Sequence, residues 1–115
     1  MDKEKDPLGF DQHAPGAKLD SGKIYADQIL RMFANALWKV CEVGTFGANK
    51  YTMGGWQHVP NGSVRYADAH MRHKLLEWKG ELNDPDSQLE HLAHTAWNSL
   101  AELELYCRQK KNDVK

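Results

Sequence analysis

Three long stretches of the chain repeat apolar residues at every third or fourth position, and no stretch alternates apolar and polar residues as a half-buried strand would. The first stretch covers about 24–50, the second 63–80 and the third about 84–108. The second and third begin at Ser63 and Asp84, whose side chains are favoured helix N-caps. The pattern therefore predicts an all-α fold, a helical bundle of three long helices plus short helical pieces.

Each stretch has one apolar face, and we expect these faces to form the core. The expected core residues are Ile29, Phe33, Ala36, Leu37, Val40, Val43 and Gly44 in the first stretch, Val64, Ala67, Met71, Leu75, Trp78 and Leu82 in the second, and Leu89, Leu92, Ala93, Ala96, Leu100, Leu103 and Cys107 in the third. Long helices joined by turns leave a second face for a partner, so we expect the bundle to be completed by oligomerisation, as a homo-oligomer.

The sequence outside these stretches is rich in glycine, proline and charge. Residues 1–22 show little periodicity and predict an N-terminal arm. The helical domain then covers 23–110, and 111–115 form a charged tail. Between the first two helices, the segment TMGGWQHVPNGS predicts a loop of roughly a dozen residues, which is long enough to suggest a functional role.

The charge balance gives no global attraction to nucleic acid or to a membrane surface, because 15 basic residues face 16 acidic ones. No apolar run approaches the roughly 18 residues of a membrane-spanning helix, and the charged N-terminus lacks the apolar stretch of a signal peptide. Cys41 and Cys107 both lie in helical patterns, so we expect buried thiols and not a disulfide. These features favour a reduced, cytoplasmic setting.

The third stretch carries an unusual polar face. His91, His94 and Asn98 lie at positions i, i+3 and i+7, on the side of the helix opposite the leucines. One interpretation is an ordinary solvent-facing surface. The other is a site, because two imidazoles one turn apart can surround one ion or act as an acid and a base.

The end of the second stretch offers a second set of polar residues. One narrow stripe beside its apolar face holds His70, Glu77 and Glu81, with His73 at the edge of the stripe, and the following turn adds Asp84 and Asp86. A short turn makes the two helices antiparallel neighbours, and carboxylates gathered on facing helices are how bundles bind Mg²⁺ or Mn²⁺. The alternative is a network of surface ion pairs, such as Lys74 with Glu77 or Glu81.

Other residues have the chemistry to hold a nucleotide. Arg72 follows Asp68 by four positions, which suits an anchored arginine that binds phosphate but is also a common structural pair. Lys50, Tyr51 and Trp56 bracket the glycine-rich loop and offer a cation for phosphate and aromatic faces for a base. An aromatic residue in a loop is nevertheless more often a cover for the core. The sequence contains no P-loop, GxGxxG, HExxH or paired CxxC motif.

Four segments carry a family resemblance: KLDSGKIYAD at 18–27, FGANKY at 46–51 with Trp56 following, RYADAHMRH at 65–73, and GELNDPDSQLEHLAHTAWN at 80–98. In this order they resemble a small phage-type family, the N-terminal domain of dATP/dGTP diphosphohydrolases, which is distantly similar to the MazG-like all-α nucleotide pyrophosphohydrolases. The resemblance implies hydrolysis of a (deoxy)nucleoside triphosphate, with purine deoxynucleotides preferred, to the monophosphate and pyrophosphate. It places the protein in the cytoplasm, which is the host's if a phage encodes it.

The resemblance also implies a Mg²⁺ or Mn²⁺ cofactor and a role for most candidate residues, to which Glu77 and Asn98 are added from their positions on the helices. The implied catalytic residues are Glu42, His73, Glu81, His91 and His94. The implied substrate-binding residues are Lys50, Tyr51, Trp56, Arg72 and Asn98. The implied metal ligands are Glu42, Glu77, Glu81, Asp84, His91 and His94.

The chain departs from the MazG-like pattern at its carboxylates. Those enzymes carry an ExxE pair on one helix and an ExxD pair on another. Here Glu42 is followed by Thr45, and the segment HLAH has histidines where the second pair is expected. Two interpretations stay open: histidines and glutamates rebuild the metal site, or the protein is a non-catalytic regulatory protein that binds a nucleotide or a host protein. The first predicts metal-dependent turnover, and the second predicts binding alone.

Overall fold

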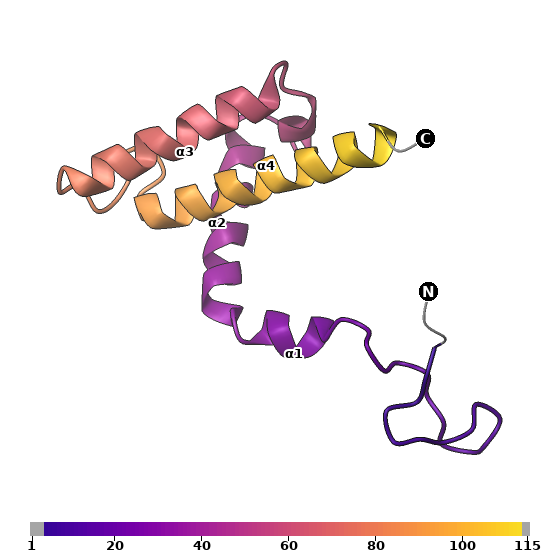
Figure 1. Cartoon of the computed structure of the whole chain (residues 1–115). Helices are drawn as coiled ribbons and strands as arrows, with labels where there is room; N and C mark the ends of the chain where they lie inside the picture. Colours follow the sequence, from indigo (N-terminus) through magenta and orange to yellow (C-terminus); the bar gives the residue numbers. More distant parts are fainter. Residues whose placement is uncertain (1–3, 114–115) are drawn as a thin grey trace. The chain divides into compact units, whose positions relative to one another are not determined.

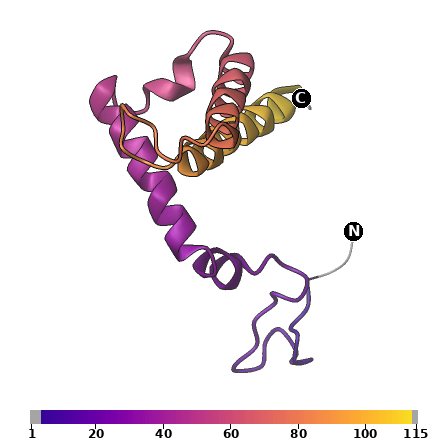
Figure 2. The ribbon, with the colours of Figure 1, turned by 90° about the vertical axis from the view of Figure 1, so that its left-hand side faces the viewer.

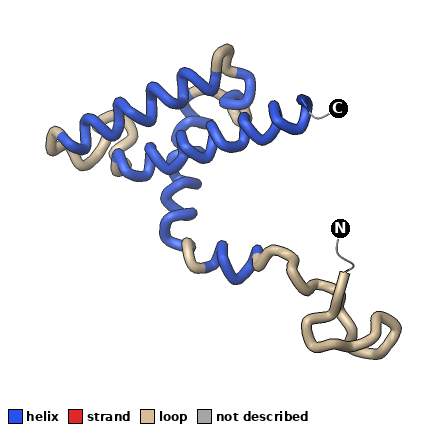
Figure 3. Tube along the Cα trace, in the orientation of Figure 1, coloured by secondary structure: helices blue, strands red, loops and turns tan. Residues whose placement is uncertain are grey.

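The computed structural model describes residues 4–113, and within this range the chain is helical, with no strand beyond one isolated bridge (Figure 3). Its elements are α1 (Ala26–Arg31), α2 (Ala34–Lys50), the 3₁₀ helix η1 (Gly55–His58), α3 (Gly62–Trp78) and α4 (His91–Asp113). The prediction of an all-α protein with three long helices plus short pieces is confirmed. The chain forms two compact units, Met1–Phe33 and Ala34–Lys115.

The N-terminal unit has no helix before Ala26 among its described residues. Its turns are organised by Asp6, whose carboxylate accepts the backbone N–H of Leu8 and of Lys18, both at 2.7 Å. These hydrogen bonds, led by the one from Lys18, hold the pKa of Asp6 below its usual value. The irregular backbone of this segment is therefore tied together locally.

The prediction of one helix over 24–50 is wrong, because the chain breaks between α1 and α2 at Met32 and Phe33. The last turn of α1 closes with short-range bonds, from Met32 N–H to the Ile29 carbonyl at 3.2 Å and from Phe33 N–H to the Leu30 carbonyl at 3.0 Å. No glycine or proline marks this break. All residues from 21 to 38 are exposed, so no core packing supports a continuous helix there.

In the second unit, α3 and α4 pack side by side as an antiparallel pair, and α2 crosses against α4 (Figures 1 and 2). The predicted end of α3 is confirmed, because the chain turns at Gly80 with φ +103°, a conformation that favours glycine. The predicted N-cap at Ser63 is wrong. The helix begins one residue earlier, after Asn61, which has φ +56° and no side-chain cap bond.

The prediction that the third helix begins at Asp84 is also wrong, because α4 begins at His91. Residues 82–91 fold back on themselves: Asp84 N–H donates to the Leu89 carbonyl at 2.8 Å and His91 N–H to the Leu82 carbonyl at 2.9 Å. The Asp84 carboxylate accepts the Ser87 N–H at 2.9 Å, so it caps a turn instead of a helix. This loop carries Asp84 back to the start of α4.

On α4 the polar face is buried and the leucine face is exposed, which is the reverse of the prediction. The buried polar residues of the described chain all lie on this helix, and they are His91, His94, Thr95 and Asn98. The predicted core residues Leu92, Leu100 and Leu103 are more than half exposed, whereas the small residues Ala93 and Ala101 are buried. Small side chains let α4 approach its neighbours closely, and the polar face is the one that packs against them.

The predicted apolar faces of α2 and α3 are also largely exposed. Val43 is the one buried apolar residue described on α2, and Val64, Met71, Leu75 and Trp78 of α3 are exposed. The two cysteines are free thiols, as predicted, but they are exposed and not buried. Among residues 4–113, no helix combines the length and the hydropathy that a membrane crossing needs.

An aromatic cluster holds η1 against the α3–α4 pair. The rings of Trp56, Tyr66 and Trp97 meet edge to face, with centroids 5.6–6.4 Å apart. The Tyr66 hydroxyl donates to the Trp56 carbonyl at 2.7 Å, which fixes the loop before α3. Gly44 of α2 lies against Trp97, where a Cβ would come within 3.2 Å of Trp97 Nε1. The glycine therefore permits close approach of α2 and α4.

Candidate functional site

Three potential metal ligands converge where α3, the 79–90 loop and α4 meet. His73 comes from α3, Asp84 from the loop and His91 from the first turn of α4, and one donor atom of each lies within 4.8 Å of the other two. We call these three residues the His–Asp cluster. The return of the loop places Asp84 here, so the unpredicted start of α4 is what builds the cluster.

The two imidazoles of the cluster are in direct contact. His73 Nδ1 lies 2.8 Å from His91 Nδ1, so at least one of these nitrogens is unprotonated. His91 is completely buried. Its second nitrogen, Nε2, lies 3.3 Å from Glu81 Oε2 but forms no hydrogen bond of acceptable geometry, so it is a buried polar atom without a partner in the described chain.

His94 supports the cluster from one side. Its ring stacks on that of His73, with centroids 4.4 Å apart and planes at 8°. The Ser87 hydroxyl lies at hydrogen-bond distance, 2.7 Å, from His94 Nε2, and it also accepts the Leu89 N–H at 3.1 Å. Asn98 donates its side-chain N–H to the His94 carbonyl at 2.8 Å. These contacts fix the orientation of His94 and, through stacking, of His73.

The electrostatics of the cluster suit a cation. Burial, reinforced by His94 and His91, lowers the pKa of His73 to about 4, although Asp84 opposes the shift. Burial also lowers the pKa of His94. The pKa of Asp84 is lowered in spite of its burial, because Ser87 donates to its carboxylate and His94 lies near. At neutral pH, neutral imidazoles of His73 and His94 therefore lie beside an ionised carboxylate.

Four of the predicted metal ligands lie outside the His–Asp cluster: Glu81 and His94 contact its histidines, whereas Glu42 and Glu77 pair elsewhere. Glu77 pairs with Lys74 at 3.3 Å, as the ion-pair interpretation of this helix predicts. Glu42 of α2 pairs with Lys39 at 3.5 Å, and Lys39 also reaches Glu90 Oε1 at 3.1 Å. Glu42 is thus linked to the edge of the site through a lysine that the sequence interpretation did not single out.

A shallow groove of about 450 Å³ lies between α2 and the loop. Trp38, Glu42, Phe46 and Asn49 of α2 line one side, and Ser87 lies on the other. Because Ser87 also bonds to His94, the groove and the imidazoles share a wall. Its aromatic residues and carboxylate could hold a planar polar molecule.

The predicted substrate-binding residues are spread around the unit. Lys50 pairs with Asp86 of the loop at 2.7 Å, which raises the pKa of Lys50, and Tyr51 beside it is exposed. Trp56 lies in the aromatic cluster, under the Arg108 guanidinium at 5.6 Å, as expected for an aromatic residue that covers the core. Arg72 is exposed and, among the described residues, forms no ion pair with Asp68.

The sequence interpretation missed Ser87, Lys39 and the groove residues Trp38 and Asn49. Ser87 could have been found, because a serine three positions after an aspartate is a common turn pattern in which the carboxylate accepts a backbone N–H. No sequence pattern marked Lys39, Trp38 or Asn49, because the groove forms only where the loop returns to α2. The predicted residues that the structure gathers are His73, Glu81, Asp84, His91 and His94.

The comparison with protein families matches residues 13–115 to the family described as dATP/dGTP diphosphohydrolase, N-terminal. This match covers most of the chain, so the chain belongs to that family. It includes the whole of the His–Asp cluster and the groove. Neither the comparison with curated proteins nor the comparison with solved structures gives a match.

Proposed function

We propose that this member of the dATP/dGTP diphosphohydrolase N-terminal family hydrolyses a purine deoxynucleoside triphosphate to the monophosphate and pyrophosphate, with the help of a divalent cation. The observation that carries the proposal is the convergence of His73, Asp84 and His91 beside a groove with aromatic walls. The family description suggests the substrate class, and the groove is our candidate for where the substrate binds.

The groove suits a nucleobase. Trp38 and Phe46 offer aromatic faces for stacking, and the Asn49 amide offers both a donor and an acceptor to the edge of a base. Lys39 and Lys50 flank this part of α2, and both are paired with carboxylates that phosphate oxygens could replace. A triphosphate held in this way would extend from the groove toward the His–Asp cluster.

The reaction needs one bond formed and one broken. A water oxygen bonds to the α-phosphorus, and the bond from this phosphorus to the α–β bridging oxygen breaks, so pyrophosphate leaves with that oxygen and its electron pair. The proton that the water loses passes to a carboxylate, and Glu42, in the groove, is our candidate. A divalent cation bound by the cluster would promote loss of this proton and neutralise phosphate charge.

The test is an assay of pyrophosphate release with each common NTP and dNTP, in Mg²⁺, in Mn²⁺, in Co²⁺ and in excess chelator. We expect metal-dependent release that is fastest with dATP or dGTP. His91→Gln and Glu42→Gln should each lower kcat by about 100-fold or more. His58→Gln, at an exposed histidine of η1, is the matched control and should retain full activity. Equal rates in all these variants would disprove the site.

The alternative is a protein that binds a nucleotide without hydrolysing it. Thr45, where MazG-like enzymes have a second glutamate, donates its hydroxyl to the Cys41 carbonyl at 2.8 Å and is engaged with its own helix. This observation favours weakened catalysis. Saturable dATP or dGTP binding without pyrophosphate release in any metal would support the alternative.

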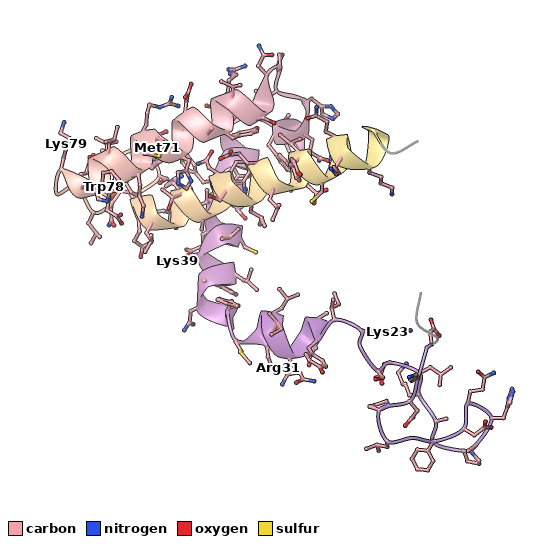
Figure 4. The ribbon with its side chains drawn as sticks, viewed as in Figure 1. Lys23, Arg31, Lys39, Met71, Trp78 and Lys79 are labelled. Carbon is pink, nitrogen blue, oxygen red and sulfur yellow. The ribbon has the colours of Figure 1, made fainter. Side chains whose placement is uncertain are left out.

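We also propose that the second unit assembles with another copy of itself. Leu92, Leu100 and Leu103 on α4 are exposed apolar residues, and so are Met71 and Trp78 of α3, which are labelled in Figure 4. Monomeric proteins rarely expose apolar patches larger than a few hundred Å². The helical spacing of these residues suits packing against an identical helix pair about a two-fold axis.

A further inference from the structure

We propose that the His–Asp cluster binds a first-row transition-metal dication, of the Co²⁺ and Zn²⁺ kind, in preference to Mg²⁺. Two of its three donors are imidazole nitrogens, and one is a carboxylate oxygen. Imidazole suits Zn²⁺, Co²⁺ and Fe²⁺, whereas Mg²⁺ takes oxygen ligands in near-ideal octahedral geometry. The family resemblance implies Mg²⁺ or Mn²⁺, so the donor set of this chain departs from that expectation for Mg²⁺.

The spacing of the donors is close to that of ligands on one ion. Imidazole nitrogens bind such ions at roughly 2.1 Å, so neighbouring ligands lie about 3.0–3.4 Å apart. His73 Nδ1 and His91 Nδ1 are 2.8 Å apart, and a separation of a few tenths of an ångström would admit an ion between them. Asp84 offers its carboxylate within 4.8 Å of both residues' donor atoms. No helix has to move for the three ligands to meet.

A second observation is the buried nitrogen of His91 that lacks a partner. His91 is 0% exposed, and its Nε2 points toward Glu81 Oε2 at 3.3 Å without a proper hydrogen bond. A metal on Nδ1 would fix the proton on Nε2 and direct it at Glu81. This is the carboxylate–histidine–metal arrangement that orients ligands in many metalloproteins. The same ion would replace the His73–His91 hydrogen bond.

The other ligands are held in place before any ion binds. Ser87 N–H fixes the Asp84 carboxylate, and the His94 ring stacks on His73. Three protein ligands leave at least one position open, which suits a catalytic site and not a closed structural one. The open position would admit water or a phosphate oxygen. Only this last step depends on the proposed hydrolase function.

The experiment is a titration of the chelator-treated full chain with Co²⁺, followed by its visible absorption. We expect saturation at one Co²⁺ per chain, displacement by Zn²⁺, and no displacement by millimolar Mg²⁺. His73→Gln and Asp84→Asn should each weaken binding by about 100-fold, and Glu81→Gln by about 10-fold. Asparagine can still accept the Ser87 N–H, so Asp84→Asn keeps the loop, and circular dichroism verifies the helix content of each variant.

The matched control is His70→Gln, one turn before His73 on α3, where the imidazole contacts the Thr95 carbonyl and Ser99 and no cluster residue. It should leave Co²⁺ binding unchanged. Absence of saturable binding, equal binding by the cluster variants, or effective competition by Mg²⁺ would each overturn the inference. Co²⁺ binding without pyrophosphate release would refute the hydrolase and leave the metal site standing. Mg²⁺-dependent pyrophosphate release by a chain that shows no saturable Co²⁺ binding would support the hydrolase and overturn the inference about the metal.

Discussion

Acidification of the metal-free protein from pH 7 to pH 5 should destabilise the second unit through His73. Burial and the neighbouring His94 and His91 lower the pKa of this imidazole from 6.5 to about 4, with Asp84 opposing and Arg72 adding to the shift. The folded state therefore resists protonation while the unfolded chain accepts it. In this interval the unfolded state binds more protons, so the free energy of unfolding rises with pH and falls on acidification.

The magnitude follows from the two pKa values. Between pH 7 and pH 5 the linkage relation gives a loss of about 1.8 kcal/mol for a shift from 6.5 to about 4. His73 is only partly buried, so solvent screening reduces the expected loss to about 1 kcal/mol. The pKa of His94 is lowered as well and acts in the same direction. The pKa values of Asp6, Asp84 and Glu90 are also lowered, and these carboxylates lose their contributions only at more acidic pH.

The measurement is urea unfolding in excess chelator at pH 7, 6 and 5, followed by tryptophan fluorescence and circular dichroism. His73→Gln should remove most of the pH dependence, because glutamine does not titrate. His58→Gln should keep it, because His58 is exposed. Equal stability at pH 5 and pH 7, or the same slope with and without His73, would refute the assignment of a neutral imidazole to this position.

Three further predictions concern packing. Tyr66→Phe removes the hydrogen bond to the Trp56 carbonyl and should lower the free energy of unfolding by about 1 kcal/mol. The measurement is urea denaturation. An unchanged free energy of unfolding would mean that other contacts hold the loop. Gly44→Leu should destabilise by about 1–3 kcal/mol, because the Cβ would already lie 3.2 Å from Trp97, whereas Gly47→Ala, with open space around its Cβ, should stabilise by about 0.5–1 kcal/mol. Leu100→Glu with Leu103→Glu should reduce the mass in solution, measured by light scattering, to that of a single chain, and unchanged mass would exclude this surface as the interface.

The class of the fold could be predicted because helical periodicity and glycine signals are local. Gly80 ends α3 where the sequence indicates, since its φ of +103° is a backbone requirement visible in one residue. The start of α4 could not be predicted in this way. Asp84 is a good N-cap by type, but the returning loop offers its carboxylate the Ser87 N–H and its own N–H the Leu89 carbonyl. That choice between two local hydrogen-bond patterns is made by tertiary contacts.

The residues of the candidate site could largely be predicted from the sequence, but the way in which the helices bring them together could not. The histidines at 73, 91 and 94 stood out because imidazoles rarely fill a solvent-facing helix surface, and the structure brings all three together. Glu77 was grouped with them by helical spacing and Glu42 by the family resemblance, yet each carboxylate has a lysine partner of its own. Spacing along one helix says which residues share a face, but the crossing of α2 decides which faces meet.

The reversed burial of α4 connects the site to assembly. A polar face is costly to bury unless its groups are paired, and here the chain pairs most of them internally: Thr95 donates to the Leu92 carbonyl, and Asn98 donates to that of His94. The atom left over is His91 Nε2. Leucines on the same helix are meanwhile exposed, although they would stabilise a monomer far more if buried between α3 and α4. Burial of the polar face and exposure of the leucines are both favourable if a second copy covers the leucines and an ion occupies the His–Asp cluster. In that case metal binding and assembly stabilise opposite faces of one helix, and loss of either should weaken the other.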